Sequence, residues 1–145
     1  MTTNAKTSQG IQLKRGDGAT TEVFTLIAEI NSIDGPDEKA KQIDVSTLDS
    51  TGHEYIAGLF EGGSIKITGN SVFSNAQQTG LRADMISGVR RNFKLLLTDT
   101  VTTSPTTYSF TAVVVAFGIK GEVDKQVMFS AELKISGVPT IAAAA

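Results

Sequence analysis

Alternating apolar and polar side chains predict strands along most of this chain. The stretch 43–69 shows the pattern at both ends, where for example Ile43 and Val45 alternate with polar neighbours. A period of two residues is typical of strands with one buried face. Between these two predicted strands, residues 49–52 (DSTG) have the composition of a tight turn. Gly62-Gly63 then provides a flexible or bulged point before the second strand.

The same alternation predicts five further strands, so that the expected total is about seven. In the predicted strand over residues 22–33, Phe24, Leu26, Ala28 and Ile30 are expected to share one face. The predicted strands over residues 108–117 and 127–136 are long and apolar on both faces at their centres. Such strands favour edge pairing with other subunits, which would complete the sheet. The five segments are residues 11–14, 22–33, 93–97, 108–117 and 127–136.

Residues 74–90 are the one good helix candidate. Ser74 is followed three residues later by Gln77, which is the form of a capping box and predicts Ser74 as the N-cap. An apolar stripe recurs every fourth position, at Leu81, Met85 and Val89. Arg90 and Arg91 are expected at the C-terminal end of the helix, where positive charge is favourable.

A charged connection separates the strand that ends near Ile33 from the one that begins at Ile43. Gly35-Pro36 interrupts the ladder, because proline has no backbone N–H to donate. Two interpretations remain open, a solvated hairpin loop or an ordered contact surface for a neighbouring subunit. The residues concerned are Asp34, Gly35, Pro36, Asp37, Glu38, Lys39 and Lys41.

Composition narrows the possible classes of protein. The length of 145 residues predicts a single domain. Abundant Thr, Ser and Gly together with the absence of Trp predict that this domain is rich in β-structure. With a net charge of −2, the chain lacks the excess of basic residues that is typical of proteins that bind the phosphates of nucleic acids. Without cysteine there are no disulfides or thiolate metal sites. The polar N-terminus predicts no signal peptide, and no apolar run is long enough for a membrane-spanning helix.

Catalytic and ligand-binding patterns are weak throughout the sequence. His53 is the single histidine, and without a G-x-S-x-G turn or cysteines it is best interpreted as a surface turn residue. Asp34, Asp37 and Glu38 lack the regular spacing of a calcium-binding loop. We therefore predict no enzymatic activity, no cofactor and no bound metal.

The order of features along the chain resembles the tail tube (major tail) proteins of long-tailed, non-contractile bacteriophages. The resemblance spans roughly residues 8–141. It is carried by S-T-L-D-S-T-G at 46–52, E-G-G-S-I-K-I-T-G at 61–69, the helix at 75–88, F-x-L-x-L at 93–97 and V-x-F-x-A-x-L-K-I-S-G at 127–137.

This resemblance implies a mainly β fold, a β-sandwich or partly closed barrel with one flanking α-helix. It implies hexameric rings in which strands of all subunits complete a larger barrel, and stacking of the rings into a tube around a tape measure protein. Tail terminator and tail-tip proteins would be further partners, and double-stranded DNA would pass without specific binding. The expected location is the virion tail after synthesis in the bacterial cytoplasm, with no membrane insertion of its own.

The resemblance also assigns domains and sites. We expect a flexible arm at 1–9, the tail-tube domain at 10–141 and a tail at 142–145. The charged connection from Asp34 to Lys41 is expected to contact the adjacent ring. Four polar strand positions are expected to face the lumen: Asp44, Lys66, Glu132 and Lys134. The alternatives are the tube of a contractile tail or type VI-like secretion system, a monomeric β-sandwich binding module, and a small hydrolase.

Overall fold

The computed structural model describes residues 11–97 and 106–143. The predicted N-terminal arm lies outside this part of the chain, as do residues 144–145 of the predicted tail. The described residues form nine strands and one helix: β1 (Gln12–Gly16), β2 (Phe24–Leu26), β3 (Ile30–Asp34), β4 (Lys39–Asp44), β5 (Tyr55–Glu61), β6 (Ser64–Asn70), α1 (Ala76–Ser87), β7 (Arg90–Leu97), β8 (Thr106–Lys120) and β9 (Met128–Ala143).

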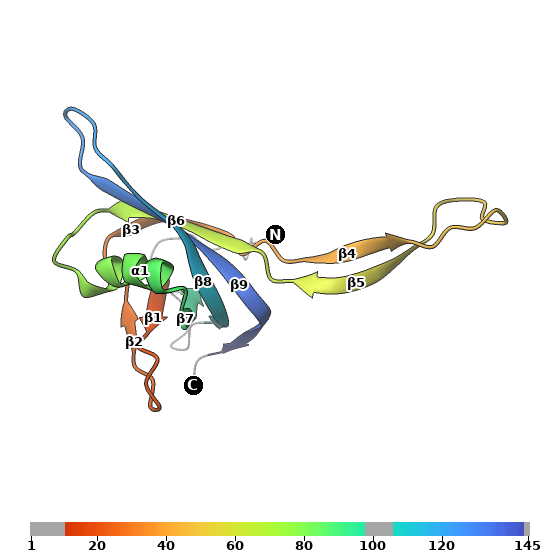
Figure 1. The fold of residues 1–145 in the computed structure, drawn as a ribbon, viewed down its shortest axis with the longest axis horizontal. Coiled ribbons are helices and arrows are strands. Elements are labelled where there is room, and N and C mark those ends of the chain that lie inside the picture. The colour runs from red at the N-terminus through yellow and green to blue at the C-terminus, as the bar shows by residue number, and fades with distance from the viewer. Residues whose placement is uncertain (1–10, 98–105, 144–145) are drawn as a thin grey trace, which may run out of the picture.

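Seven of these strands form one antiparallel sheet in the order β2-β1-β7-β8-β9-β6-β3. The two edge strands do not pair with each other, so the sheet is not closed into a barrel. Strands β4 and β5 form a separate antiparallel ribbon that projects far from the sheet (Figure 1). The predicted mainly β class with one helix is confirmed. The two strands beyond the predicted seven are β5 of the ribbon and one that arises from the division of the segment 22–33.

The hydrophobic core lies on one face of the seven-stranded sheet, beneath helix α1. Phe93 and Phe129 are its largest fully buried side chains, and Leu81 joins them from the helix. Phe93 stacks on Phe110 with ring centroids 5.7 Å apart. In the two longest strands the alternation of the sequence predicts that Phe110, Phe129 and Leu133 point into the core, and all three are buried, which confirms the inner faces.

The segment predicted as one strand over 22–33 is divided in two. Glu29 has a positive φ of 62°, and the chain turns there between β2 and β3. Ile27 is buried and its N–H donates to the Leu13 carbonyl at 3.0 Å, whereas Leu26 is largely exposed. The predicted shared face was therefore wrong, because the turn breaks the alternation on which it depended.

The helix begins and ends differently from the prediction. Asn75, not Ser74, is the N-cap, and its Oδ1 accepts the N–H groups of Gln77 and Gln78 at 3.2 and 3.0 Å. Gly88 ends the helix in the left-handed conformation, where glycine has no steric penalty. Arg90 and Arg91 consequently belong to β7 rather than to the helix, and Val89 is exposed rather than part of a buried stripe.

The stretch 43–69 contains one more strand than predicted. Its central apolar segment is β5, which pairs with β4 in register from Lys39 opposite Glu61 to Asp44 opposite Tyr55. Ile43 and Val45 are 40% and 41% exposed, so the prediction that they are half-buried in this subunit was wrong. The sequence pattern was strand-like, but the ribbon projects away from the core that would have covered it.

Candidate functional site

The β4–β5 ribbon and its tip carry seven of the nineteen large hydrophobic side chains that are exposed among the described residues. Every residue of β4 is exposed, and in β5 only Gly58 is partly covered. A two-stranded ribbon is marginally stable in water by itself, and a group of exposed apolar side chains on such a ribbon is a candidate interaction site. The exposed apolar side chains are Ile43, Val45, Leu48, Tyr55, Ile56, Leu59 and Phe60.

The base of the ribbon is fixed to β9 through two glycines. The Gly63 carbonyl accepts the Ile135 N–H at 3.0 Å, and Gly63 has a positive φ of 78°. A Cβ on Gly62 would lie 2.5 Å from Ile135 Cγ2, and one on Gly63 would meet the carbonyl group of Asp37. Glycine is therefore required at both positions for the ribbon to leave the sheet at this angle.

Side-chain hydrogen bonds order the tip of the ribbon, residues 45–54. The Glu54 N–H donates to Ser46 Oγ at 2.7 Å, and Ser50 Oγ donates to Glu54 Oε2 at 2.8 Å. The Thr47 N–H donates to Ser50 Oγ at 2.9 Å. These bonds close the turn around Leu48, whose side chain is fully exposed.

The single histidine lies at the end of this ribbon. His53 stacks on Tyr55 with ring centroids 6.1 Å apart, and its Nδ1 is 3.8 Å from Asp44 Oδ2. The Ser46 N–H, which donates to Asp44, holds the pKa of that carboxyl below its usual value. Ser50 bonds to Glu54 and not to the histidine. The predicted surface position of His53 is confirmed, and the arrangement lacks the contacts of a Ser-His-Asp triad.

The residues predicted to contact the adjacent ring lie at the base of the ribbon rather than in one loop. Asp34 ends β3, while Lys39 and Lys41 are already part of β4. Lys39 Nζ is 3.5 Å from Glu61 Oε2 across the ribbon. Asp37 and Glu38 are exposed between the strands, whereas Gly35 and Pro36 are partly covered. Their contact with another ring remains a prediction.

Three of the four predicted lumen residues lie together on the outer face of the sheet, opposite the core. Lys66 pairs with Glu132 in the β6–β9 register, and Lys134 is the next outward residue of β9. Asp44 is separate, because it belongs to the ribbon. The rest of this outer face is rich in hydroxyls. They come from Ser32, Ser64, Thr68, Thr107, Ser109, Thr111, Ser130 and Ser136.

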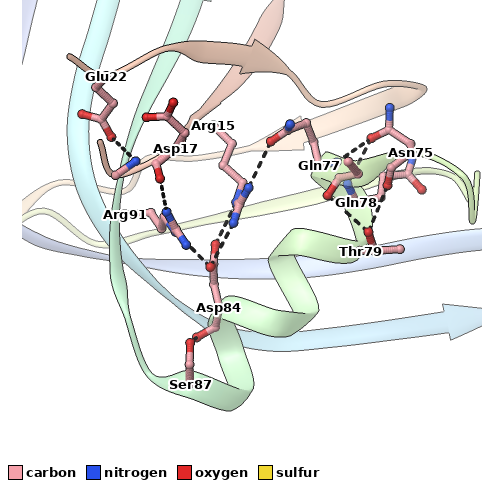
Figure 2. Close-up of polar contacts among 12 residues, drawn as sticks. Arg15, Asp17, Glu22, Asn75, Gln77, Gln78, Thr79, Asp84, Ser87 and Arg91 are labelled. Carbon is pink, nitrogen blue, oxygen red and sulfur yellow. Dashed lines mark hydrogen bonds and ion pairs between the residues drawn. The ribbon is translucent and has the colours of Figure 1, made fainter. Parts of the chain in front are cut away.

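A buried carboxylate, which the sequence reasoning missed, joins the helix to the sheet (Figure 2). Asp84 is 2% exposed; its Oδ2 is 2.8 Å from Arg15 Nε, and its Oδ1 is 3.0 Å from Arg15 Nη2 and 2.9 Å from Arg91 Nε. Arg15 Nη1 also donates to Gln77 Oε1 at 3.1 Å. The signal was present, because Asp84 follows Leu81 by three residues and therefore lies on the inner side of the helix.

A second buried polar residue of the helix, Gln78, is also fully paired. Its Nε2 donates to the carbonyls of Ala28 and Asn70 at 2.8 and 3.1 Å, and its Oε1 accepts the Val72 N–H at 2.8 Å. Both buried polar side chains of α1 are thus hydrogen-bonded within the fold, as buried polar groups usually are. Among residues 11–97 and 106–143 there is no cluster of metal-ligating side chains. No helix in the same ranges is long and apolar enough to cross a membrane.

Solved structures with this fold come from tubular tails and injection systems. A chain from the tail of an empty gene transfer agent particle with C6 symmetry matches with a TM-score of 0.78 at 15% identity, covering 95% of this chain and 99% of that one. A chain of the SPP1 tail tube matches with a TM-score of 0.73 at 14% identity, covering 92% and 76%. A chain from the sheath/tube terminator of the extracellular contractile injection system PVC matches with a TM-score of 0.73 at 12% identity, covering 98% and 99%.

No family model and no curated protein matches this sequence. The structural matches span nearly the whole chain, so the resemblance in sequence features extends to the complete fold. The chain therefore has the fold of tail tube proteins, with an uncovered ribbon as its candidate site.

Proposed function

We propose that this chain is a structural subunit that polymerises into a tail tube and has no enzymatic activity. The observation that carries the proposal is the β4–β5 ribbon, which exposes apolar side chains along its whole length in a chain with the tail tube fold. Such a surface is stable in water when a partner covers it, and another copy of the chain is the simplest partner.

The first level of assembly would be a hexameric ring. The seven-stranded sheet has free edges at β2 and β3, so it has backbone donors and acceptors available for pairing with neighbours. Six copies would complete a larger barrel in this way, in keeping with the C6 symmetry of the gene transfer agent tail. Stacking of the rings through the ribbon and its base, Asp34–Lys41, would then extend the tube.

The lumen of this tube would be lined by the outer face of the sheet. That face carries many hydroxyls, and Asp34 and Glu132 lie on either side of Lys66. The registers place Lys14, Arg90, Lys94 and Lys134 on the same face, so it has a modest basic excess. Tight DNA binding requires several phosphates to be neutralised by Lys or Arg. The net charge of the whole subunit is −2, and double-stranded DNA would pass through the lumen without specific binding. Tape measure, terminator and tail-tip proteins would be the partners in a virion tail, made in the bacterial cytoplasm.

A tube within a contractile injection system is the second candidate function. It is favoured by the PVC match and by a chain of the anti-feeding prophage baseplate with a TM-score of 0.73 at 10% identity. The two candidates differ in whether a sheath surrounds the tube. Copurification of a sheath protein with tubes from the native source would favour the contractile system over a non-contractile phage tail.

The direct test is the state of the purified protein at increasing concentration. We expect light scattering to show growth well beyond the monomer mass, and negative-stain micrographs to show rings and tubes. The matched control lacks the ribbon, with residues 40–60 replaced by a short Gly-Ser linker. We expect it to keep the circular dichroism signal of the seven-stranded sheet, reduced only by the loss of the ribbon, and to stay small. A parent protein that remains a compact monomer at all concentrations, with or without tail-tip extract, would contradict the proposal.

A further inference from the structure

We propose that Leu48, at the tip of the β4–β5 ribbon, inserts into an apolar pocket beside helix α1 of a second copy of this chain. The inference rests on the proposed function, since it names the contact by which successive copies would be joined. It is carried by the shape of the tip, the lining of the pocket, the charges around both, and their positions in the subunit.

The tip presents Leu48 as a fixed apolar projection. Hydrogen bonds among Ser46, Thr47, Ser50 and Glu54 close the turn on both sides of it. Its side chain is fully exposed, so the subunit itself provides no cover. An apolar side chain held in place by an ordered turn loses little conformational freedom on binding, which favours its use as an anchor.

The receiving pocket lies between the β6–α1 connection and β8. Its volume is about 170 Å³, and its apolar lining comes from Val72, Phe73, Phe117 and Ile119. Phe73 and Ile119 are more than half exposed, so the subunit leaves this lining uncovered. An apolar cavity of about 150 Å³ accommodates benzene, and the isobutyl group of leucine is smaller. The pocket is therefore large enough for Leu48.

Charges around the two surfaces are complementary. The ribbon tip and the last residue of β4 before it, residues 44–54, contain three carboxylates, Asp44, Asp49 and Glu54, and no lysine or arginine. Arg82, which lies on the exposed side of α1, lines the pocket. An acidic tip approaching a cationic rim gains in association rate and in register, even where each exposed pair contributes little energy.

The two surfaces lie at opposite ends of the molecule. Figure 1 places the ribbon tip at one end of the longest axis, and the β6–α1 connection and the β8–β9 turn toward the other. Leu48 therefore cannot reach the pocket of its own chain. A head-to-tail contact between two different surfaces, repeated from copy to copy, produces a closed ring where the rotation closes and an open polymer where it does not. Growth of a tube from ring to ring requires the open form of this contact.

Cysteine cross-linking tests the contact directly, because the chain has no cysteine of its own. One batch carries Leu48→Cys and a second carries Thr79→Cys, at an exposed residue of the pocket lining. The two are mixed, allowed to assemble and treated with a short bis-maleimide. We expect covalent dimers in the mixture and few in either batch alone. The matched control uses Val138→Cys in place of Thr79→Cys. Val138 is also exposed but lies outside the pocket, so we expect no dimer with it.

The outcomes separate this inference from the proposed function. Tubes in the micrographs without Leu48–Thr79 dimers would overturn the inference and leave the tube function standing. Dimers without tubes would support the contact and contradict the function. An absence of both would overturn both.

Substitution of Leu48 provides an independent measurement. Leu48→Lys places a cation against Arg82 and removes the apolar anchor, so we expect the critical concentration for assembly to rise about tenfold or more. Leu48→Met keeps an apolar side chain of similar volume and should leave it nearly unchanged. Equal critical concentrations for the lysine and methionine variants would overturn the inference.

Discussion

Two arginines share one buried carboxylate at Asp84, and this contact ties helix α1 to two strands of the sheet. Arg15 comes from β1 and Arg91 from β7, so three elements distant in sequence meet at one charge. Removing one member of a buried ionic cluster leaves the others desolvated and uncompensated, which costs more than the intact cluster contributes. The cluster is therefore more informative about the orientation of the helix than about net stability.

The substitution Asp84→Asn tests this. It keeps the size of the side chain but removes the negative charge that both guanidinium groups contact, so we expect a loss of about 3 kcal/mol in the free energy of unfolding. Urea denaturation of the free subunit measures the change. Glu38→Gln removes an exposed carboxylate and should change stability by less than about 0.5 kcal/mol. Equal stabilities of the two variants would show that the cluster does not fix the helix.

Phe129 gives the corresponding prediction for the core. It is almost completely buried and stacks on Phe117 with centroids 6.3 Å apart. Phe129→Ala removes this burial and leaves a cavity, so we expect a loss of about 3–5 kcal/mol. Val138→Ala, at an exposed position near the other end of β9, is the control and should cost little. A Phe129→Ala protein as stable as the control would contradict the assigned inner face of β9.

At the scale of elements, the sequence predicted strands better than it predicted their boundaries and their burial. The alternation in β8 and β9 is long enough to fix both faces, and Phe110 and Leu133 are buried as expected. In the segment 22–33 a single residue in the left-handed region at Glu29 resets the register, and nothing in the period-two pattern marks such a turn. In the ribbon, alternation indicated strands correctly but could not indicate whether the subunit itself covers them.

The sequence pattern and the structure assign different N-cap residues to α1, and substitution can decide between them. Because Asn75 accepts two backbone N–H groups, Asn75→Ala should lower the free energy of unfolding by about 1 kcal/mol. Ser74→Ala, at the residue that the capping-box pattern had favoured, should have almost no effect. Thermal unfolding of both variants decides between them, and a larger loss for Ser74→Ala would reverse the assignment.

The base of the ribbon provides the second prediction at this scale. Replacing residues 37–39 with a Gly-Ser segment removes the exposed charges and the Lys39–Glu61 ion pair, but it leaves the core and the Asp84 cluster intact. We expect a normally folded subunit that fails to form long tubes, as judged by circular dichroism and electron microscopy. Tubes as abundant as those of the parent would show that ring contacts lie elsewhere, for example only at the ribbon tip.

For the whole molecule, the sequence identified the residues of the outer sheet face but not how they group. Lys66, Glu132 and Lys134 lie together because β6 and β9 are neighbours in the sheet, although more than sixty positions separate them in the chain. Asp44 was grouped with them from its polar position in a strand, and it lies on the ribbon instead. The residues around a strand do not show which distant strand it pairs with. The sequence therefore could not show which of the four predicted residues lie together.

Accessibility in assembled tubes tests which face lines the lumen. Lys66→Cys and Lys134→Cys should react with a small maleimide but be protected from a maleimide coupled to a polymer too large to enter the tube. Ala83→Cys, on the exposed side of helix α1, should react with both. Reactivity of Lys66→Cys and Lys134→Cys toward the large reagent would place this face on the outside and contradict the assignment.

The glycine pair at the base of the ribbon has a mechanical consequence for such a tube. The ribbon leaves the sheet through two short connections, residues 35–38 and Gly62-Gly63, while the sheet beyond them is held by a continuous antiparallel ladder. Bending between adjacent rings would therefore concentrate at these connections, and the wall of each ring would keep its inner diameter. A tube of this kind could curve without pinching the passage along its axis.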